Sequence, residues 1–219
     1  MIKALIAVRS GSERVQNKNI RPFAGKNLLE HKITQLKSLN CLDGIVVNSN
    51  DDYMLEVATK MGCEAVKRND YYASSQCCMS DVYVNLAENF SADTIVYTNV
   101  TNPLVKNETI EQTIDIYIKN QGVYSSVNTA HLIKEFLYLN GQPLNYCLTQ
   151  QPRSQDLPDI YALNFAVSVI SRVDMIKFKN VIAPNHYLLA IPEQEALDID
   201  SEFDFTVAEY IFNKTKIRQ

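Results

Sequence analysis

Short apolar runs alternate along the chain with segments in which apolar residues recur at the spacing of a helix face. The apolar runs of strand length cover residues 2–8, 44–47, 63–66, 94–98, 123–127, 165–170 and 187–191. Helical spacing is found at residues 28–39, 51–61, 81–90, 108–119 and 202–213. Strands that alternate with helices in this way are typical of an α/β fold, in which helices flank a mostly parallel sheet.

The alternation breaks between residues 131 and 158, where the pattern is irregular. An Asn140-Gly141 turn stands there between the apolar segments 136–139 and 144–148, which is a hairpin signal. We therefore expect one domain spanning residues 1–219, with 131–158 as an antiparallel excursion from the sheet. The excursion can be a surface flap or, because of its apolar side chains, a dimerisation arm, and the pattern leaves both open.

A polar loop, residues 9–19, directly follows the first apolar run and has the chemistry of a phosphate site. It contains Gly11, the hydroxyl side chains of Ser10 and Ser12, and the cations Arg9, Arg14 and Lys18. Ligands of open α/β sheets bind beyond the carboxyl ends of the strands, where backbone N–H groups and cations can hold a polyphosphate. The spacings of the P-loop and of the dinucleotide fingerprint are absent, which argues against a classical NTPase and a nicotinamide enzyme. Taken alone, a solvated basic loop remains the alternative.

A second candidate site lies near the end of the chain, at Asp198-Ile199-Asp200. Alternate carboxylates of an extended chain point the same way, and two of them can hold Mg²⁺ while it keeps waters and substrate oxygens. Taken alone, this acidic pair is better explained as a complement to the positive end of the following helix. The asparagine-rich turn at residues 99–104 could bind a sugar or a base, although an ordinary proline turn is preferred when it is considered by itself.

Composition and charge narrow the functional classes. The formal net charge of −4 with mixed signs argues against nucleic acid as a partner, because binding to its backbone needs a clustered basic surface. No apolar run approaches the length of a membrane span, and the apolar start is too short for a signal peptide. The cysteines are odd in number and form no C-x-x-C, so we expect reduced thiols in the cytoplasm rather than disulfides or zinc. They are Cys41, Cys63, Cys77, Cys78 and Cys147.

Four segments, taken in order, resemble motifs of the acylneuraminate (CMP-sialic acid synthetase type) cytidylyltransferases. Residues 6–19 resemble the opening P-loop-like motif, and Gln151, Pro152 and Arg153 begin a segment similar to the family's Q-P-R. Asn164-Phe165-Ala166 resembles a variant of its N-G-A strand start. Residues 196–204, followed by Ala208-Glu209, resemble its carboxyl-terminal D-I-D signature. The resemblance spans nearly the whole chain in the right order, which makes it more specific than any single motif.

The resemblance implies a Rossmann-like nucleotidyltransferase fold, Mg²⁺ as cofactor, CTP and an acidic sugar as substrates, and a homodimer. In that family the anomeric hydroxyl of a free sugar acid attacks the α-phosphorus of CTP, giving a CMP-sugar and pyrophosphate. The implied catalytic residues are Arg9, Lys18 and Asp200, and the implied metal ligands are Asp198 and Asp200. The implied nucleotide-binding residues are Arg9, Ser10, Gly11, Ser12, Lys18, Asn19 and Arg68, and the implied sugar-side residues are Asn99, Asn102, Arg153 and Asn164.

Several positions depart from the family pattern. Glu13 stands where Lys or Arg is usual, Asn50 and Ser75 replace Asp, Asn99 replaces Gln, Val105 replaces Arg, and Ala162-Leu163 replaces an Arg-Pro pair. Because several of these lie on the implied sugar side, we expect retained nucleotide chemistry and an altered sugar pocket. A nonulosonic or related acidic sugar other than N-acetylneuraminate is at least as good a candidate. The alternatives are a 3-deoxy-manno-octulosonate cytidylyltransferase, a sugar-1-phosphate nucleotidyltransferase, and a non-catalytic nucleotide-binding homologue.

Overall fold

The computed structural model describes residues 1–12 and 14–216. Its central sheet is built from β1 (Ile2–Ala7), β4 (Gly44–Ser49), β5 (Glu64–Lys67), β6 (Thr94–Tyr97), β7 (Ser126–Ile133), β10 (Ile160–Ser171) and β11 (His186–Ala190). Within the described residues these seven strands lie in the order β11-β7-β10-β6-β1-β4-β5. β10 is antiparallel to β6 and β7, and the other neighbouring pairs are parallel. The predicted α/β fold with a mostly parallel sheet is confirmed.

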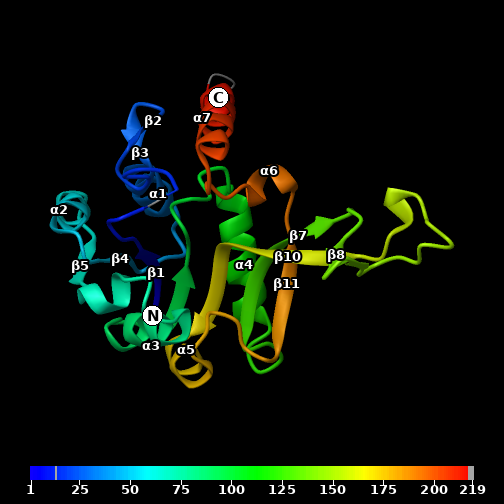
Figure 1. The fold of residues 1–219 in the computed structure, drawn as a ribbon. Coiled ribbons are helices and arrows are strands. Elements are labelled where there is room, and N and C mark those ends of the chain that lie inside the picture. Colours follow the sequence, from blue (N-terminus) through cyan, green and yellow to red (C-terminus); the bar gives the residue numbers. More distant parts are fainter. Residues whose placement is uncertain (13, 217–219) are drawn as a thin grey trace.

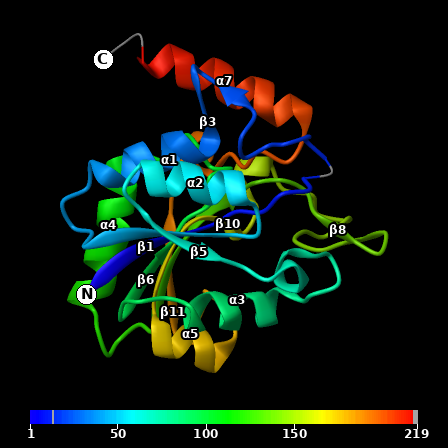
Figure 2. The same cartoon turned by 90° about the vertical axis from the view of Figure 1, so that its left-hand side faces the viewer.

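Helices cover both faces of the sheet (Figures 1 and 2). They are α1 (Leu28–Lys37), α2 (Asp52–Lys60), α3 (Met79–Glu88), α4 (Asn107–Lys119), α5 (Arg172–Phe178), α6 (Glu193–Ala196) and α7 (Glu202–Lys216). Figure 2 shows the strands between a layer containing α1, α2 and α4 and a layer containing α3 and α5. β1 is buried on both faces, with Ala4 and Ile6 in one hydrophobic cluster and Leu5 in the other. Burial on both faces explains why its sequence is a continuous apolar run rather than an alternating one.

The predicted helix starts at α1 and α2 are confirmed, and each has a side-chain cap. The Asn27 side chain accepts a hydrogen bond from the Glu30 backbone N–H at 2.9 Å, and the Glu30 carboxylate accepts one from the Asn27 N–H at 3.0 Å. This reciprocal pair is a capping box. Asp51 caps α2 by accepting from the Met54 N–H at 2.9 Å. No helix in the described part of the chain is long and apolar enough to span a membrane.

The antiparallel excursion projects sideways from the sheet between β7 and β10 (Figure 1). Its hairpin pairs β8 (Tyr138–Leu139) with β9 (Gln142–Pro143) around Asn140-Gly141, whose φ angles of 51° and 77° are those of a tight hairpin turn. The predicted strand over 144–148 is wrong. Pro143 cannot donate to a ladder, and the Asn145 side chain instead bonds the backbones of Leu137 and Glu135.

Two further boundaries differ from the sequence prediction. β7 begins at Ser126 rather than at residue 123, because Val123 and Tyr124 donate to the Asn120 carbonyl in a turn after α4. β7 also continues to Ile133, inside the stretch expected to be irregular, where Ile133 pairs with Ile160 of β10. The excursion is therefore rooted in long strands that continue from the main sheet. Pattern reading also missed α5, whose helix cap is the Ser171 side chain.

Candidate active site

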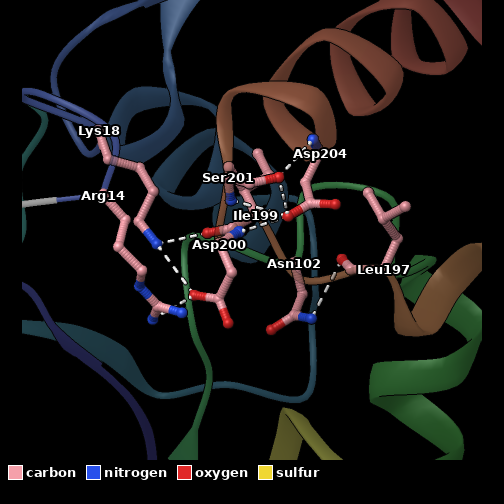
Figure 3. A network of polar contacts seen from close by, with 8 residues as sticks. All are labelled: Arg14, Lys18, Asn102, Leu197, Ile199, Asp200, Ser201 and Asp204. Atoms are coloured by element: carbon pink, nitrogen blue, oxygen red, sulfur yellow. Dashed lines mark hydrogen bonds and ion pairs between the residues drawn. The ribbon is translucent and has the colours of Figure 1, made fainter.

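The opening loop and the acidic segment meet at one end of the sheet, although they are far apart in sequence (Figure 3). The Lys18 ammonium donates to the Ile199 carbonyl, and its Nζ lies 3.6 Å from Asp200 Oδ1. Arg14 Nη2 lies 2.7 Å from the same carboxylate oxygen. Cations from the loop after β1 therefore face the carboxylate of the second aspartate, as expected for two sides of one site.

Asp198 and Asp200 have different environments. Asp200 faces the cations of the loop, whereas Asp198 is partly buried and its Oδ1 is a buried oxygen without a hydrogen-bond partner among the described residues. Burial raises the pKa of the Asp198 carboxyl above its ordinary value, although a hydrogen bond with Thr101 opposes the shift. A buried carboxylate oxygen without a donor is suited to a cation, and hard oxygen ligands are those that Mg²⁺ prefers.

These two aspartates are the residues that could hold a metal ion here. The described residues contain no group of three or more His, Cys, Asp or Glu side chains arranged for a metal. A cation at this site would therefore take its remaining ligands from water and substrate oxygens. That ligand balance is usual for Mg²⁺ bound together with a substrate phosphate.

The acidic segment is held by a device that pattern reading did not identify. Asp204 accepts hydrogen bonds from the backbone N–H groups of Asp200 at 3.1 Å and Ser201 at 2.7 Å. The Ser201 hydroxyl in turn accepts from the Asp204 N–H at 3.2 Å, which completes a capping box at the start of α7. The signal was present in the sequence as Ser-x-x-Asp. This box fixes the backbone of Asp200 to the first turn of the helix.

The opening loop is held by internal contacts, and its glycine has a left-handed backbone conformation. Gly11 has a φ of 76°, in the left-handed region where side chains are strained. The Asn19 amide donates to the Arg9 carbonyl at 3.0 Å, and Val15 is buried beneath the loop. The Arg9 guanidinium donates to the Ala73 carbonyl at 2.8 Å. Arg9 and Lys18 thus bond to different segments, at Ala73 and at Ile199.

Neighbouring strand ends support this loop. The Asn50 side chain accepts from the Ser10 N–H at 3.2 Å and donates to the Ser10 hydroxyl at 3.1 Å. Arg68 is only 5% exposed, and its guanidinium donates to the carbonyls of Val8 and Asn48. Arg68 therefore joins the carboxyl ends of β1 and β4 beneath the loop. Its predicted nucleotide contact stays a prediction, as do those of Ser10, Gly11, Ser12 and Asn19.

The implied sugar-side residues are not all brought together. Asn102 is fully buried, and its amide donates to the carbonyls of Ala196 at 3.3 Å and Leu197 at 3.2 Å, just before Asp198. Figure 3 shows the contact with Leu197. Asn99 is partly buried in the same turn after β6. Asn102 thus ties the asparagine turn to the acidic segment, and its own side-chain oxygen has no partner in the described part of the chain.

The other two sugar-side candidates lie on β10 and the excursion. Asn164 is buried at an irregularity of β10, where its side-chain oxygen accepts from the Thr129 hydroxyl at 2.7 Å and the Ala166 N–H at 3.1 Å. Arg153 is exposed on the excursion and pairs with Asp156 at 2.7 Å. Arg153 is therefore not brought to Asp200 in this conformation. Its sugar-side role remains a prediction.

The structure gives the contacts of two residues that depart from the family pattern, Asn50 and Val105. Asn50 bonds Ser10 of the opening loop, as described above. Val105 is buried, and its carbonyl accepts from the Gln35 amide at 2.6 Å, so this position contributes to the core rather than a cation to the surface. Glu13 lies outside the described residues.

A pocket of about 610 Å³ lies beside the asparagine turn. Residues of α1, α6, α7 and the segment 100–108 line it, and none of the predicted phosphate or metal residues do. It contains the buried Lys32, whose Nζ donates to Gln35 Oε1 at 3.0 Å and to the Asn102 carbonyl at 3.1 Å. Lys32 therefore supports the asparagine turn from the side of this pocket.

Several known proteins align with nearly the whole of this chain. The chain is 26% identical to a pseudaminic acid cytidylyltransferase of Campylobacter jejuni over 95% of this chain and 94% of the relative. It is 25% identical to a CMP-N,N'-diacetyllegionaminic acid synthase of Legionella pneumophila over 95% of this chain and 94% of the relative. An N-acylneuraminate cytidylyltransferase of Streptococcus agalactiae is 23% identical over 98% of this chain, which spans 54% of that longer protein.

Solved structures share the fold. CMP:2-keto-3-deoxy-manno-octonic acid synthetase complexed with CTP superposes with a TM-score of 0.72 at 12% identity, covering 98% of this chain and 99% of that one. The 4-diphosphocytidyl-2C-methyl-D-erythritol synthase of Anaerococcus prevotii has a TM-score of 0.71 at 12% identity, covering 97% and 98% of the two chains. A family model described as cytidylyltransferase matches residues 3–193, and the chain belongs to that family.

Proposed function

We propose that this cytidylyltransferase activates a nonulosonic acid with CTP and releases pyrophosphate. The observation that carries the proposal is the meeting of the loop cations with the acidic pair, where Arg14 and Lys18 lie 2.7 Å and 3.6 Å from Asp200 Oδ1. A polyphosphate with a bound divalent cation requires both signs of charge at one place.

The residues of this site have distinct roles in the proposed reaction. Lys18, Arg9 and the backbone N–H groups of the opening loop bind the triphosphate and offset the charge that develops during transfer. The anomeric oxygen of the sugar forms a bond to the α-phosphorus, and the bond from that phosphorus to the oxygen that bridges it to the β-phosphorus breaks. Pyrophosphate leaves with the bridging oxygen, and the proton of the sugar hydroxyl passes to solvent water. Asp198 and Asp200 would hold Mg²⁺, which when bound neutralises phosphate charge and makes an oxygen ligand more acidic.

The class of sugar is inferred from the relatives and from the altered sugar side. Relatives that align over nearly their whole length are named for pseudaminic and diacetyllegionaminic acids. Asn99, Asn102 and Asn164 offer neutral amides, and Arg153 is the one cation among the four implied sugar-side residues. We therefore favour a nonulosonic acid of this kind over N-acetylneuraminate. The 3-deoxy-manno-octulosonate enzyme is only 12% identical to this chain, so the likeness shows a shared fold and does not favour 3-deoxy-manno-octulosonate as the substrate.

Assembly and location belong to the same proposal. Exposed apolar side chains on the excursion, among them Tyr138, Leu139, Leu144 and Leu148, support a homodimer formed through it. The free thiols of the chain support a reducing, cytoplasmic location, because exposed cysteines such as Cys78 and Cys147 would be oxidised elsewhere.

The test is pyrophosphate release with CTP and Mg²⁺ across a panel of nonulosonic acids, N-acetylneuraminate and 3-deoxy-manno-octulosonate, with products identified by mass spectrometry. We expect a CMP-sugar from a pseudaminic- or legionaminic-type acid at a higher kcat/KM than from the other two. Calorimetric binding of CTP without turnover of any acid would instead support a non-catalytic homologue.

A further inference from the structure

Two cations approach one oxygen of Asp200, but they are held very differently (Figure 3). The Lys18 side chain is 14% exposed, and its ammonium is anchored by the Ile199 carbonyl. The Arg14 side chain is 71% exposed, and Asp200 is its only polar partner among the described residues. Lys18 is thus a fixed part of the site, whereas Arg14 is tethered by a single exposed ion pair.

The position of Arg14 conflicts with a second role of Asp200. An Asp200 oxygen that accepts a charge-assisted hydrogen bond at 2.7 Å is not free to ligate a divalent cation at the same lone pair. A guanidinium so close would also repel that cation. Exposed ion pairs are weak and are easily exchanged. The Arg14 contact therefore inhibits metal binding modestly and reversibly.

An alternative partner for Arg14 follows from the loop that carries it. The planar fork of a guanidinium matches phosphate oxygens as well as it matches a carboxylate. Arg14 belongs to the same loop as Arg9 and Lys18. The proposed function assigns Arg9 and Lys18 to the binding of the triphosphate. A long, exposed side chain held by a single ion pair can change its partner by rotating about its own side-chain bonds.

We propose that Arg14 is an exchangeable cation of the reaction cycle, which neutralises Asp200 in the free protein and transfers to the triphosphate when CTP binds. The inference rests on the proposed function, because it takes Asp200 as a metal ligand and CTP as the substrate. It has a consequence for binding order. The divalent cation binds weakly to the free protein and tightly when CTP has withdrawn Arg14 from Asp200.

The experiment measures Mn²⁺ binding by the electron paramagnetic resonance of the free ion, with and without CTP, in wild type, Arg14→Gln and Arg21→Gln. Arg21 is a matched control, because it forms a similar ion pair of 2.7 Å with Glu202 at the start of α7. Without CTP, Arg14→Gln should bind Mn²⁺ about three- to tenfold more tightly than wild type, and Arg21→Gln should match wild type within about twofold. Calorimetry with CTP should show about tenfold weaker nucleotide binding for Arg14→Gln alone.

Two results would overturn the exchange. One is Mn²⁺ affinity of the CTP-free Arg14→Gln protein within about twofold of wild type, and the other is unchanged CTP affinity. Circular dichroism and thermal unfolding establish that each variant is folded, which is expected because Arg14 is exposed. Failure of the proposed function is separate: wild type that releases no pyrophosphate on any acid contradicts the transferase, whatever the Mn²⁺ titrations show.

Discussion

Asp200 illustrates what a single residue gains from its surroundings. In sequence it is one acid of an Asp-x-Asp pair, which on its own is better explained by the positive end of the following helix. In the structure its partners are Arg14 and Lys18, which are 186 and 182 positions away in the chain. A short sequence motif cannot reveal a contact between residues so far apart in the chain. The acidic pair could therefore be predicted as a candidate from its residue types, but its cationic neighbours could be assigned only through the resemblance or the fold.

The replacement Asp200→Asn should remove activity and leave the fold intact. Asp200 is about half exposed and pairs with the exposed Arg14 at 2.7 Å and with the mostly buried Lys18 at 3.6 Å, so the free energy of unfolding should fall by only about 1 kcal/mol. The loss of a metal-binding, charge-neutralising carboxylate should reduce kcat/KM at least about 100-fold. Urea unfolding and pyrophosphate release measure the two effects. Glu202→Gln is the control, because Glu202 pairs with Arg21 beside the site. A loss of activity in Asp200→Asn that is fully explained by its loss of stability would exclude the metal role.

Lys32 gives a second prediction at the residue scale, and it concerns pH. Burial lowers the pKa of this lysine from 10.5 to about 7. Between these values the unfolded chain holds the proton and the folded protein does not, so the contribution of Lys32 to stability rises with pH. The free energy of unfolding of wild type should therefore rise relative to that of Lys32→Met, by up to about 1.4 kcal/mol per pH unit between about pH 7.5 and 9.5.

The measurement is the midpoint of urea unfolding of both proteins across that pH range. Lys37→Met is the matched control, because Lys37 is exposed on the same helix. Its stability difference from wild type should stay constant with pH. A Lys32→Met difference that is also independent of pH would show that the ammonium remains charged in the folded protein.

At the scale of elements, the sequence predicted most of the sheet and helices and failed where long-range pairing decides. β1, β4 and β6 were located by apolar runs that are buried on both faces. β7 was placed too early, because the apolar residues Val123 and Tyr124 belong to a turn. The outer part of β10 was missed, since its strand conformation there depends on pairing with β7 and not on its own pattern.

The capping box at the start of α7 leads to a prediction for that element. Ser201→Ala and Asp204→Ala should each lower the free energy of unfolding by about 1 kcal/mol. Ser201→Ala leaves the Asp204 N–H in the first turn unpaired, and Asp204→Ala leaves the N–H groups of Asp200 and Ser201 unpaired just before the helix. The double variant should lose less than the sum, because both side chains belong to one reciprocal pair. Thr206→Ala is the control, since its hydroxyl bonds the Glu202 carbonyl within the helix and serves no cap. Additive losses would show that the two side chains act independently.

At the scale of the whole molecule, the unexplained feature is the excursion, which carries exposed leucines on a segment that projects from the sheet (Figure 1). Leu139 and Leu148 are 59% and 62% exposed, and a second copy of the chain would remove them from water. We expect wild type to have about twice the chain mass of 24.9 kDa by light scattering, and Leu139→Ser/Leu148→Ser to shift to the monomer mass. Phe203→Ser is the matched control, because Phe203 is 76% exposed on α7 and lies outside the excursion. The dimer arm would be contradicted if Phe203→Ser were also monomeric, or if wild type were monomeric at micromolar concentration. The excursion would then be a surface flap.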